Sequence, residues 1–282
     1  MRPIKLITDS TSDLSVELAQ KRDIAIVPLY VNFGLQSGKD NVDITTKELF
    51  DKVKETGQLP KTSAPTIADY ATEFKKYIDE GKDVLYISLS SKISTSYQNA
   101  CATALQFPEG RVKIIDSLNL SSGVGILVMT AADCIERGLS LDATISEVQS
   151  LIPRVKTRFL LDTVEYLHKG GRCSGLQMLL SSLLEIHPII EVTDGTMHLA
   201  EKVRGNRQVV LRSLVKDALD NMDSMRQDRI FVTHCECPED ASWVQTQLAE
   251  PHRIKQILLM NANCVISSHC GPKTRGIIYI EK

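Results

Sequence analysis

The chain has 282 residues and a formal net charge of −2, from 33 lysine and arginine residues against 35 aspartate and glutamate residues. This length suggests two domains, or one large α/β domain, with room for an internal cavity, and the balanced charge disfavours a general attraction to nucleic acid or to anionic lipid. Aromatic residues make up only 5% of the chain, so a base-stacking surface for single strands is disfavoured as well.

The chain shows no sign of a membrane segment, an export signal or a metal site. Its start has no long apolar core, and every longer apolar stretch is interrupted by polar residues. Seven cysteines, an odd number, are typical of reduced thiols. Cys235 and Cys237 have no second pair at zinc-like spacing. We therefore expect a cytoplasmic protein without an integral membrane segment and without a bound metal.

The first half of the chain shows the same order of elements several times: a short apolar strand, then a polar turn, then a helix. Strands are expected at 4–7, 24–31, 84–89 and 112–115. Helical patterns between these strands predict right-handed crossovers and therefore a parallel sheet. Pro28 indicates an edge or a bulge in the second strand, and the polar segment 33–45 is expected to be a surface loop.

A stiff loop at 59–66 lies between two predicted helices. Thr45 and Glu48 form a capping box for the first helix. Two prolines in the loop restrict the residues before them to extended conformations. The adjacent hydroxyls of Thr62 and Ser63 can therefore hold a ligand group in fixed geometry, although the segment can also be a simple helix entry.

The stretch 83–100 combines a buried strand, a hydroxyl-rich turn and the start of a helix. The turn carries six hydroxyl side chains, those of Ser88, Ser90, Ser91, Ser94, Thr95 and Ser96. Hydroxyls beside a helix N-terminus at the carboxyl end of a parallel strand favour a small anionic group. The alternative is that these residues only cap the helix and complete the turn.

After Pro153 the pattern changes to a mixed or antiparallel sheet with helices. Asp194 and Gly195 lie between two apolar runs, which is a strong hairpin signal. Arg172 and His269 are expected in turns. We predict an α/β fold with an N-terminal parallel-sheet α/β/α domain at 1–155, a C-terminal mixed or antiparallel α+β domain at 156–282, and a ligand between them.

The motifs also raise two other kinds of site, a hydrolase active site and a nucleotide-binding site. Ser94 and His269 raise the possibility of a serine esterase acting on acyl chains, but the chain has no G-x-S-x-G sequence. A nucleotide site would need a complete glycine-rich motif, and Gly123 with Gly125 is only a fragment of one. The hydroxyl-rich turns are the more specific signal.

Five segments together resemble the DegV family of bacterial fatty-acid-binding proteins. They are TDSTSDL at 8–14, KTSAPT at 61–66, SSKISTSYQNA at 90–100, DTVEYLHKGGRCSG at 162–175 and SSHCGP at 267–272. The resemblance implies a carrier, not an enzyme, that holds one long-chain fatty acid such as palmitate without any cofactor. It also implies a partner fatty acid kinase that converts the bound acid to an acyl phosphate. A regulatory module that senses acyl chains is an alternative.

The resemblance also implies roles for individual residues. Those expected to hold the fatty-acid carboxylate are Thr62, Ser63, Ser94, Thr95 and His269. Arg172 and Arg204 are expected near the opening, facing the kinase or the phosphate. Thr95 and Lys273 stand where the family usually has glycine, and both changes lie on the head-group side.

Overall fold

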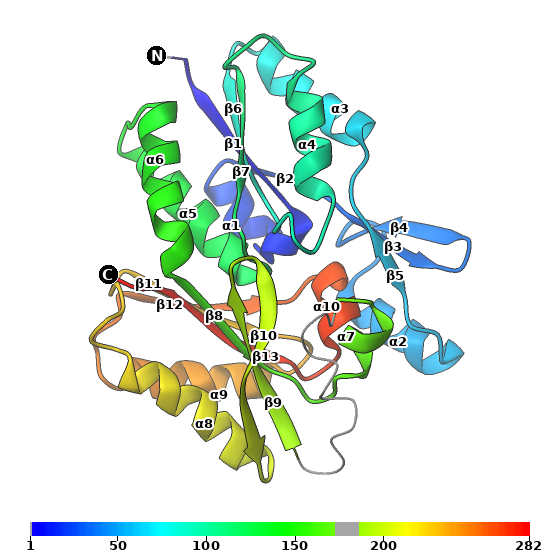
Figure 1. Ribbon diagram of the computed structural model, residues 1–282, viewed down its shortest axis with the longest axis vertical. Helices are drawn as coiled ribbons and strands as arrows, with labels where there is room; N and C mark the ends of the chain where they lie inside the picture. The colour runs from blue at the N-terminus through cyan, green and yellow to red at the C-terminus, as the bar shows by residue number, and fades with distance from the viewer. Residues whose placement is uncertain (1, 173–185) are drawn as a thin grey trace.

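The computed structural model describes residues 2–172 and 186–282 and contains a parallel sheet, a larger mixed sheet and a small third sheet (Figure 1). The parallel sheet has the strand order β2-β1-β6-β7. Its strands are β1 (Ile4–Asp9), β2 (Ile24–Val27), β6 (Asp83–Ser88) and β7 (Val112–Asp116). All three pairings are parallel, as the alternation of apolar strands and helices predicts.

Helices cover both faces of the parallel sheet. On one face lie α3 (Ile67–Asp79) and α4 (Ser96–Ala104). On the other lie α1 (Val16–Lys21), α5 (Ser122–Glu136) and α6 (Leu141–Leu151). Thr66 caps α3 and Ser140 caps α6 through side-chain oxygens that accept from backbone N–H groups.

The mixed sheet has the strand order β10-β9-β8-β13-β11-β12. Its strands are β8 (Val155–Leu160), β9 (Ile186–Thr193), β10 (Thr196–Arg204), β11 (Arg229–His234), β12 (Gln256–Asn261) and β13 (Arg275–Ile280). The helices α8 (Arg207–Asp220) and α9 (Pro238–Ala249) pack on its outer face. The hairpin predicted at Asp194 and Gly195 is confirmed, with both residues at positive φ.

Helix α5 lies between the two large sheets and packs against both (Figure 1). One apolar core joins α5 side chains to Leu85 of the parallel sheet and to Phe231 and Ile278 of the mixed sheet. Gly125 permits this close packing, because a Cβ at that position would lie 2.6 Å from the carbonyl oxygen of Ser12. The glycine therefore serves helix packing, not a nucleotide.

The single strand predicted at 24–31 is wrong, because the chain leaves the parallel sheet after β2. Pro28 has no N–H group to continue the ladder. The chain then forms a separate three-stranded sheet from β3 (Tyr30–Phe33), β4 (Gln36–Lys39) and β5 (Lys61–Ser63). The loops predicted at 33–45 and 59–66 are thus partly strands, which pair antiparallel with β3.

The remaining helical segments lie near the carboxyl ends of the parallel strands or at the entry to the mixed sheet. They are η1 (Ser10–Ser12), α2 (Thr46–Thr56), η2 (Ile152–Arg154), α7 (Glu165–Lys169) and α10 (Cys264–Cys270). The capping box of Thr45 and Glu48 is confirmed at the start of α2. His269, expected in a turn, instead lies in the last turn of α10. Asn263 and Gly271 flank this helix at positions typical of a helix start and stop.

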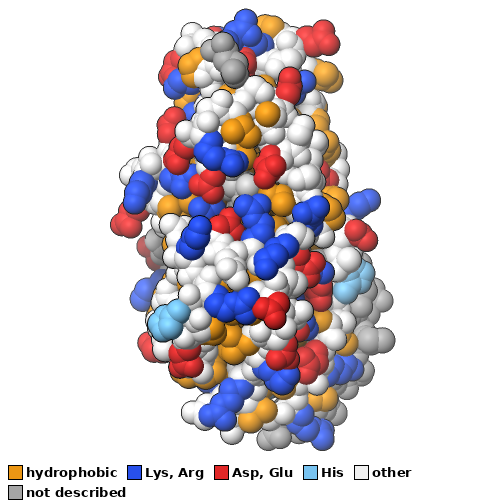
Figure 2. Space-filling view, turned by 90° about the vertical axis from the view of Figure 1, so that its left-hand side faces the viewer, with side chains coloured by type: hydrophobic (Ala, Val, Ile, Leu, Met, Phe, Trp, Pro, Cys, Tyr) orange, Lys and Arg blue, Asp and Glu red, His pale blue; other side chains and the backbone are white. Residues whose placement is uncertain are grey.

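Basic and acidic side chains are interspersed over the face of the molecule shown in Figure 2. This arrangement agrees with the near-zero net charge and gives that face no continuous basic stripe. Across the described residues, the helices are all too short or too polar to cross a membrane. The six cysteines that the described ranges contain are free thiols.

Candidate functional site

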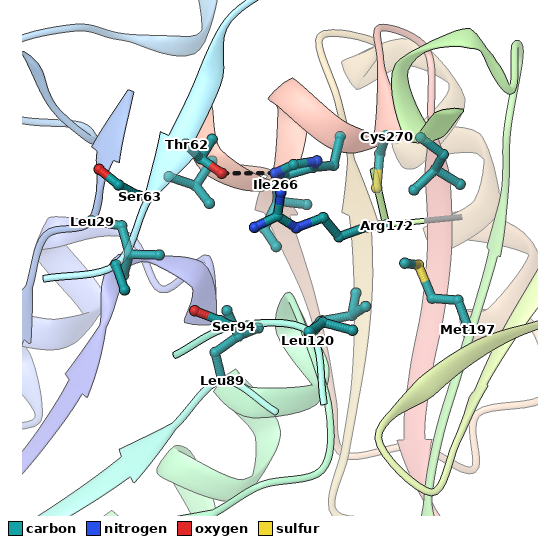
Figure 3. Close-up of a pocket in the computed structure, with 15 residues that line it drawn as sticks. Leu29, Thr62, Ser63, Leu89, Ser94, Leu120, Arg172, Met197, Ile266 and Cys270 are labelled. Atoms are coloured by element: carbon teal, nitrogen blue, oxygen red, sulfur yellow. Dashed lines mark hydrogen bonds between the residues drawn. The ribbon is translucent and has the colours of Figure 1, made fainter. Parts of the chain in front are cut away.

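One cavity lies where the small sheet, the turn after β6, α7 and α10 meet (Figure 3). It holds about 520 Å³ of empty space, counting the open part at its mouth. Its polar lining consists of Thr62, Ser63, Ser94, Arg172 and His269. The rest of the lining is mostly apolar: Leu29, Ala64, Leu89, Ile93, Leu120, Leu167, Met197, Val265, Ile266 and Cys270.

Thr62 and His269 form a hydrogen bond at the polar end of the cavity. The Thr62 hydroxyl oxygen lies 2.8 Å from His269 Nε2 (Figure 3). Gly170, which ends α7, packs against the other side of the imidazole, and a Cβ there would overlap His269 Nδ1. The first glycine of the GGR segment is therefore explained by the space that the histidine ring needs.

His269 is neutral at physiological pH. Burial, together with the nearby positive charge of Arg172, lowers the pKa of the imidazole to about 4. Its buried Nδ1 has no hydrogen-bond partner among the described residues. An unpaired buried N–H costs more than an unpaired lone pair, so the single proton is best placed on Nε2. Nε2 then donates to Thr62, and the Thr62 hydroxyl proton is free to donate into the cavity.

Arg172 supplies positive charge to the cavity. Its guanidinium points toward the space between Thr62 and Ser94 in Figure 3. Its Nη1 donates to the carbonyl oxygen of Gly170 at 2.9 Å, which holds the side chain against the end of α7. A guanidinium held in this way has further N–H donors that can reach an anionic group.

Ser94 faces the same cavity from the turn after β6. Its hydroxyl accepts from the backbone N–H of Ser96 at 3.2 Å, and its oxygen lies 2.9 Å from the Ser96 hydroxyl oxygen. It is the member of the six-hydroxyl group in the turn that lines the cavity. Ser90 instead donates to the carbonyl oxygen of Gly195, so it ties this turn to the β9–β10 hairpin.

The other predicted site residues are placed differently. Ser63 lines the cavity, but its hydroxyl accepts from Asn32 at 3.2 Å and is exposed. Thr62 and Ser63 are neighbours in β5, so their side chains point to opposite faces of that strand. Thr95 and Arg204 are exposed and lie outside the cavity lining. Thr95 has a φ of −83°, so glycine is not needed there.

Buried carboxylates fix the start of α10, the helix that carries His269. Asp40 accepts from the backbone N–H groups of Cys264 and Val265 at 2.8 and 3.3 Å, and Asp13 accepts from that of Asn263 at 2.9 Å. These N–H groups belong to the helix N-terminus and have no partner within the helix. Burial raises the pKa of Asp40 to about 6, and burial also raises the pKa of Asp13 well above its usual value.

A second, more enclosed cavity begins behind the first. The gaps between its atoms total about 350 Å³ when space open to solvent is counted, and it shares Leu120, Ile266 and Cys270 with the first cavity. Its walls come from β8, β11, β13 and the start of α5, and they include Phe159 and Ile278. Because these three residues line both cavities, the polar part of the first cavity and the apolar space beside the mixed sheet are neighbours separated by side chains.

The sequence does not single out the apolar lining of either cavity. Leucine, isoleucine and methionine that face a cavity look the same in sequence as those that fill a core. The sequence also gives no sign of the role of Asp40. A polar residue in a predicted loop does not indicate that its carboxylate caps a helix more than 200 residues later. Met197 follows a predicted hairpin turn, yet only the packing of that hairpin against Ser90 brings it to the site.

Comparison with known proteins gives a consistent result over the whole chain. Residues 3–282 match the family described as uncharacterised proteins of the DegV family. A DegV domain-containing protein of Clostridium acetobutylicum is 34% identical over 282 residues, which is 100% of both chains. A structure described as fatty acid binding of a DegV family protein from Thermus thermophilus is 32% identical, has a TM-score of 0.93 and covers 100% of both chains. A stearic-acid-binding protein from Eubacterium ventriosum is 26% identical, has a TM-score of 0.87 and covers 99% of this chain and 98% of its own.

Proposed function

The chain belongs to the DegV family, and from that premise we propose that it binds one long-chain fatty acid and carries it in the cytoplasm. The observation that supports this most directly is the shape and chemistry of the cavities. A polar end with hydroxyl donors and an arginine adjoins a mostly apolar space. A ligand with one acidic end and a long hydrocarbon chain matches both parts.

The head group is assigned to the polar end. The Thr62 and Ser94 hydroxyls donate to the carboxylate, Arg172 balances its charge, and neutral His269 orients Thr62. Ser63 and Thr95, also expected at this site, are secondary because their side chains are exposed. A carboxylate held mainly by hydroxyls keeps an oxygen available for reaction, because no tight ion pair encloses it.

The hydrocarbon tail is assigned to the apolar lining and to the second cavity. Leu120, Ile266 and Cys270 stand between the two spaces, so rotation of these side chains joins them. Each methylene group transferred from water contributes about 0.8 kcal/mol. A chain the length of palmitate therefore gains most of its binding free energy from the tail, and the polar end sets its orientation.

A partner kinase completes the proposal. In it, the kinase phosphorylates the presented carboxylate, the chain itself performs no catalysis, and no cofactor is involved. Arg172 at the cavity and exposed Arg204 at the end of β10 are the proposed contacts with the kinase or with the transferred phosphate. Guanidinium groups suit this role because they bind phosphate through paired N–H donors.

The esterase alternative lacks support from the geometry. His269 bonds to Thr62 through Nε2, and the partner of the Ser94 hydroxyl is Ser96. A serine nucleophile needs a base within hydrogen-bond reach. The arrangement of these residues therefore favours binding over hydrolysis.

Native mass spectrometry of the purified protein tests the proposal. The expected result is a mass increment of one acyl chain, removed by delipidation and restored by added palmitate. The double variant Thr62→Val, Ser94→Ala should retain much less lipid, and Thr56→Val, which removes an exposed hydroxyl in α2, is the matched control. A delipidated protein that takes up no fatty acid, with circular dichroism showing it folded, would contradict the proposal.

A further inference from the structure

Three side chains form the boundary between the two cavities. Leu120, Ile266 and Cys270 line both of them, and all three are buried. Leu120 comes from the turn after β7, whereas the other two come from α10. A molecule that extends from one cavity into the other must therefore pass between these side chains. Cys270 has the smallest side chain of the three.

The wall of the second cavity is suited to hydrocarbon. Among the described residues it contains four hydroxyl side chains, and each of them donates its proton to another part of the protein. They are Ser121, Thr157, Thr233 and Thr274, whose acceptors are the side chains of Asp13, Asn119 and Ser122 and the carbonyl oxygen of Cys270, in that order. A polar substituent on a tail would compete for protons that are already in use. An unsubstituted hydrocarbon tail fits this space better.

Two sides of the boundary are held firmly. Leu118 and Ser121, which flank Leu120 at a distance of one or two residues, have φ of 47° and 54°, and such values persist only where the surrounding contacts fix the backbone. The N–H of Leu120 donates to Asn119 Oδ1 at 3.0 Å. Ile266 is β-branched and lies within a helix, where its first side-chain torsion has one strongly preferred value. The width of the boundary therefore depends mainly on its third member.

Cys270, the third member, has a fixed backbone and a small apolar side chain. Its carbonyl oxygen accepts from the Thr274 hydroxyl at 2.9 Å. Burial raises the pKa of the thiol to about 12, so it stays protonated and behaves as a small hydrophobic group. In Figure 3 its sulfur points from α10 toward the side of the cavity where Leu120 and Met197 lie. The space left at the boundary thus depends on the size of this side chain.

We propose that Cys270 is a specificity-determining residue, whose side-chain volume sets how long a hydrocarbon tail the protein accepts. A short tail ends within the first cavity and does not reach the boundary. A long tail passes Cys270 and enters the second cavity. This inference rests on the proposed function, since it takes the head group to lie at the polar end of the first cavity.

A titration of delipidated protein with saturated acids from octanoate to stearate tests the proposal. In the wild type, each added methylene group should raise the affinity about fourfold for as long as the tail finds apolar space. Cys270→Leu fills the boundary, so the rise should stop at a shorter acid. The ratio of palmitate affinity to decanoate affinity should then fall about tenfold or more, which corresponds to about two methylene groups left outside the apolar space.

Cys264→Ala is the matched control on the same helix. The Cys264 thiol is buried and donates to the carbonyl oxygen of Ile44 at 3.1 Å, and it lines neither cavity. Its loss can loosen α10 but leaves the boundary unchanged. The control should therefore affect acids of all lengths equally and keep the ratio of the wild type.

Cys270→Val and Cys270→Ala add a graded comparison. Valine fills less space than leucine, so it should lower the ratio by a smaller factor and provides a second test if the leucine variant does not fold. Alanine removes the sulfur and should not lower the ratio. Folded leucine or valine variants with the ratio of the wild type would overturn the inference. Wild-type protein that binds none of the acids would instead contradict the proposed function.

Discussion

His269 Nε2 lies 2.8 Å from the Thr62 hydroxyl oxygen, and this one bond joins α10 to the small sheet across the polar end of the cavity. The two residues are 207 positions apart in the chain. Because the histidine is neutral and donates through Nε2, it fixes the Thr62 oxygen and leaves the threonine proton available. The pair is therefore a prepared donor for an acidic head group.

Thr62→Val should weaken palmitate binding about fivefold to twentyfold, since the change keeps the shape of the side chain and removes one donor to a charged acceptor. Titration of delipidated protein with palmitate measures the effect. Ser63→Ala should change the affinity by less than about twofold, because the Ser63 hydroxyl is exposed and bonded to Asn32. Equal losses in both variants would show that the strand presents both hydroxyls to the ligand.

His269→Gln should change how stability depends on pH. The imidazole pKa falls from an ordinary 6.5 to about 4 in the folded protein, so between these values the unfolded chain binds the extra proton. The wild type therefore loses stability as the pH falls through this window, by a contribution on the order of 3 kcal/mol in total.

Glutamine can still donate to Thr62 but does not titrate, so the variant should lack this contribution. Urea unfolding at pH 7 and at pH 4.5 measures it as a difference between the two proteins. Asp40, whose pKa is raised to about 6, acts in the opposite direction, but it is present in both and cancels. If both proteins lost the same free energy of unfolding between pH 7 and pH 4.5, an imidazole pKa of about 4 would be ruled out.

Gly125→Ala should destabilise the protein by about 2 kcal/mol or more, because the new methyl group would lie 2.6 Å from the carbonyl oxygen of Ser12. Backbone, unlike a flexible side chain, cannot move aside at low cost. Gly57→Ala is the control, with φ of 68° and open space around the added atom, and should cost only about 1 kcal/mol. Thermal unfolding of the two variants compares them directly, and a smaller loss for Gly125→Ala would show that η1 can shift.

Lys273→Gly should stabilise the protein by roughly 1 kcal/mol, because Lys273 has a φ of 58°, in the left-handed region that glycine adopts without strain. Its N–H donates to the carbonyl oxygen of Cys235 at 2.8 Å, so the conformation is fixed by the fold. Lys273→Ala keeps the strain and removes only the charge, and its melting temperature should stay close to that of the wild type. A gain shared by both variants would point to the lysine charge instead of the backbone.

Much of the fold follows from the sequence because its local signals agree with one another. The parallel strands, the capping box at Thr45 and the hairpin at Asp194 depend on nearby residues, and the structure confirms them. The strand predicted across Pro28 failed because an apolar run shows burial but not which sheet buries it.

The candidate site was predictable only in part. Thr62 and Ser94 do line one cavity, although their contact with a carboxylate stays a prediction. Thr95 was expected beside Ser94 but is exposed, since consecutive residues at a helix start point in different directions. The role of Asp40 depends on the docking of α10, and no pattern near Asp40 reports that contact.

The placement of α5 between two sheets has a consequence for how the molecule comes apart. Since Leu85, Phe231 and Ile278 share one core with this helix, we expect the two sheets to lose their order together. We expect calorimetry to show a single heat-absorption peak, and severing the chain near residue 155 to leave two fragments that aggregate unless they are refolded together.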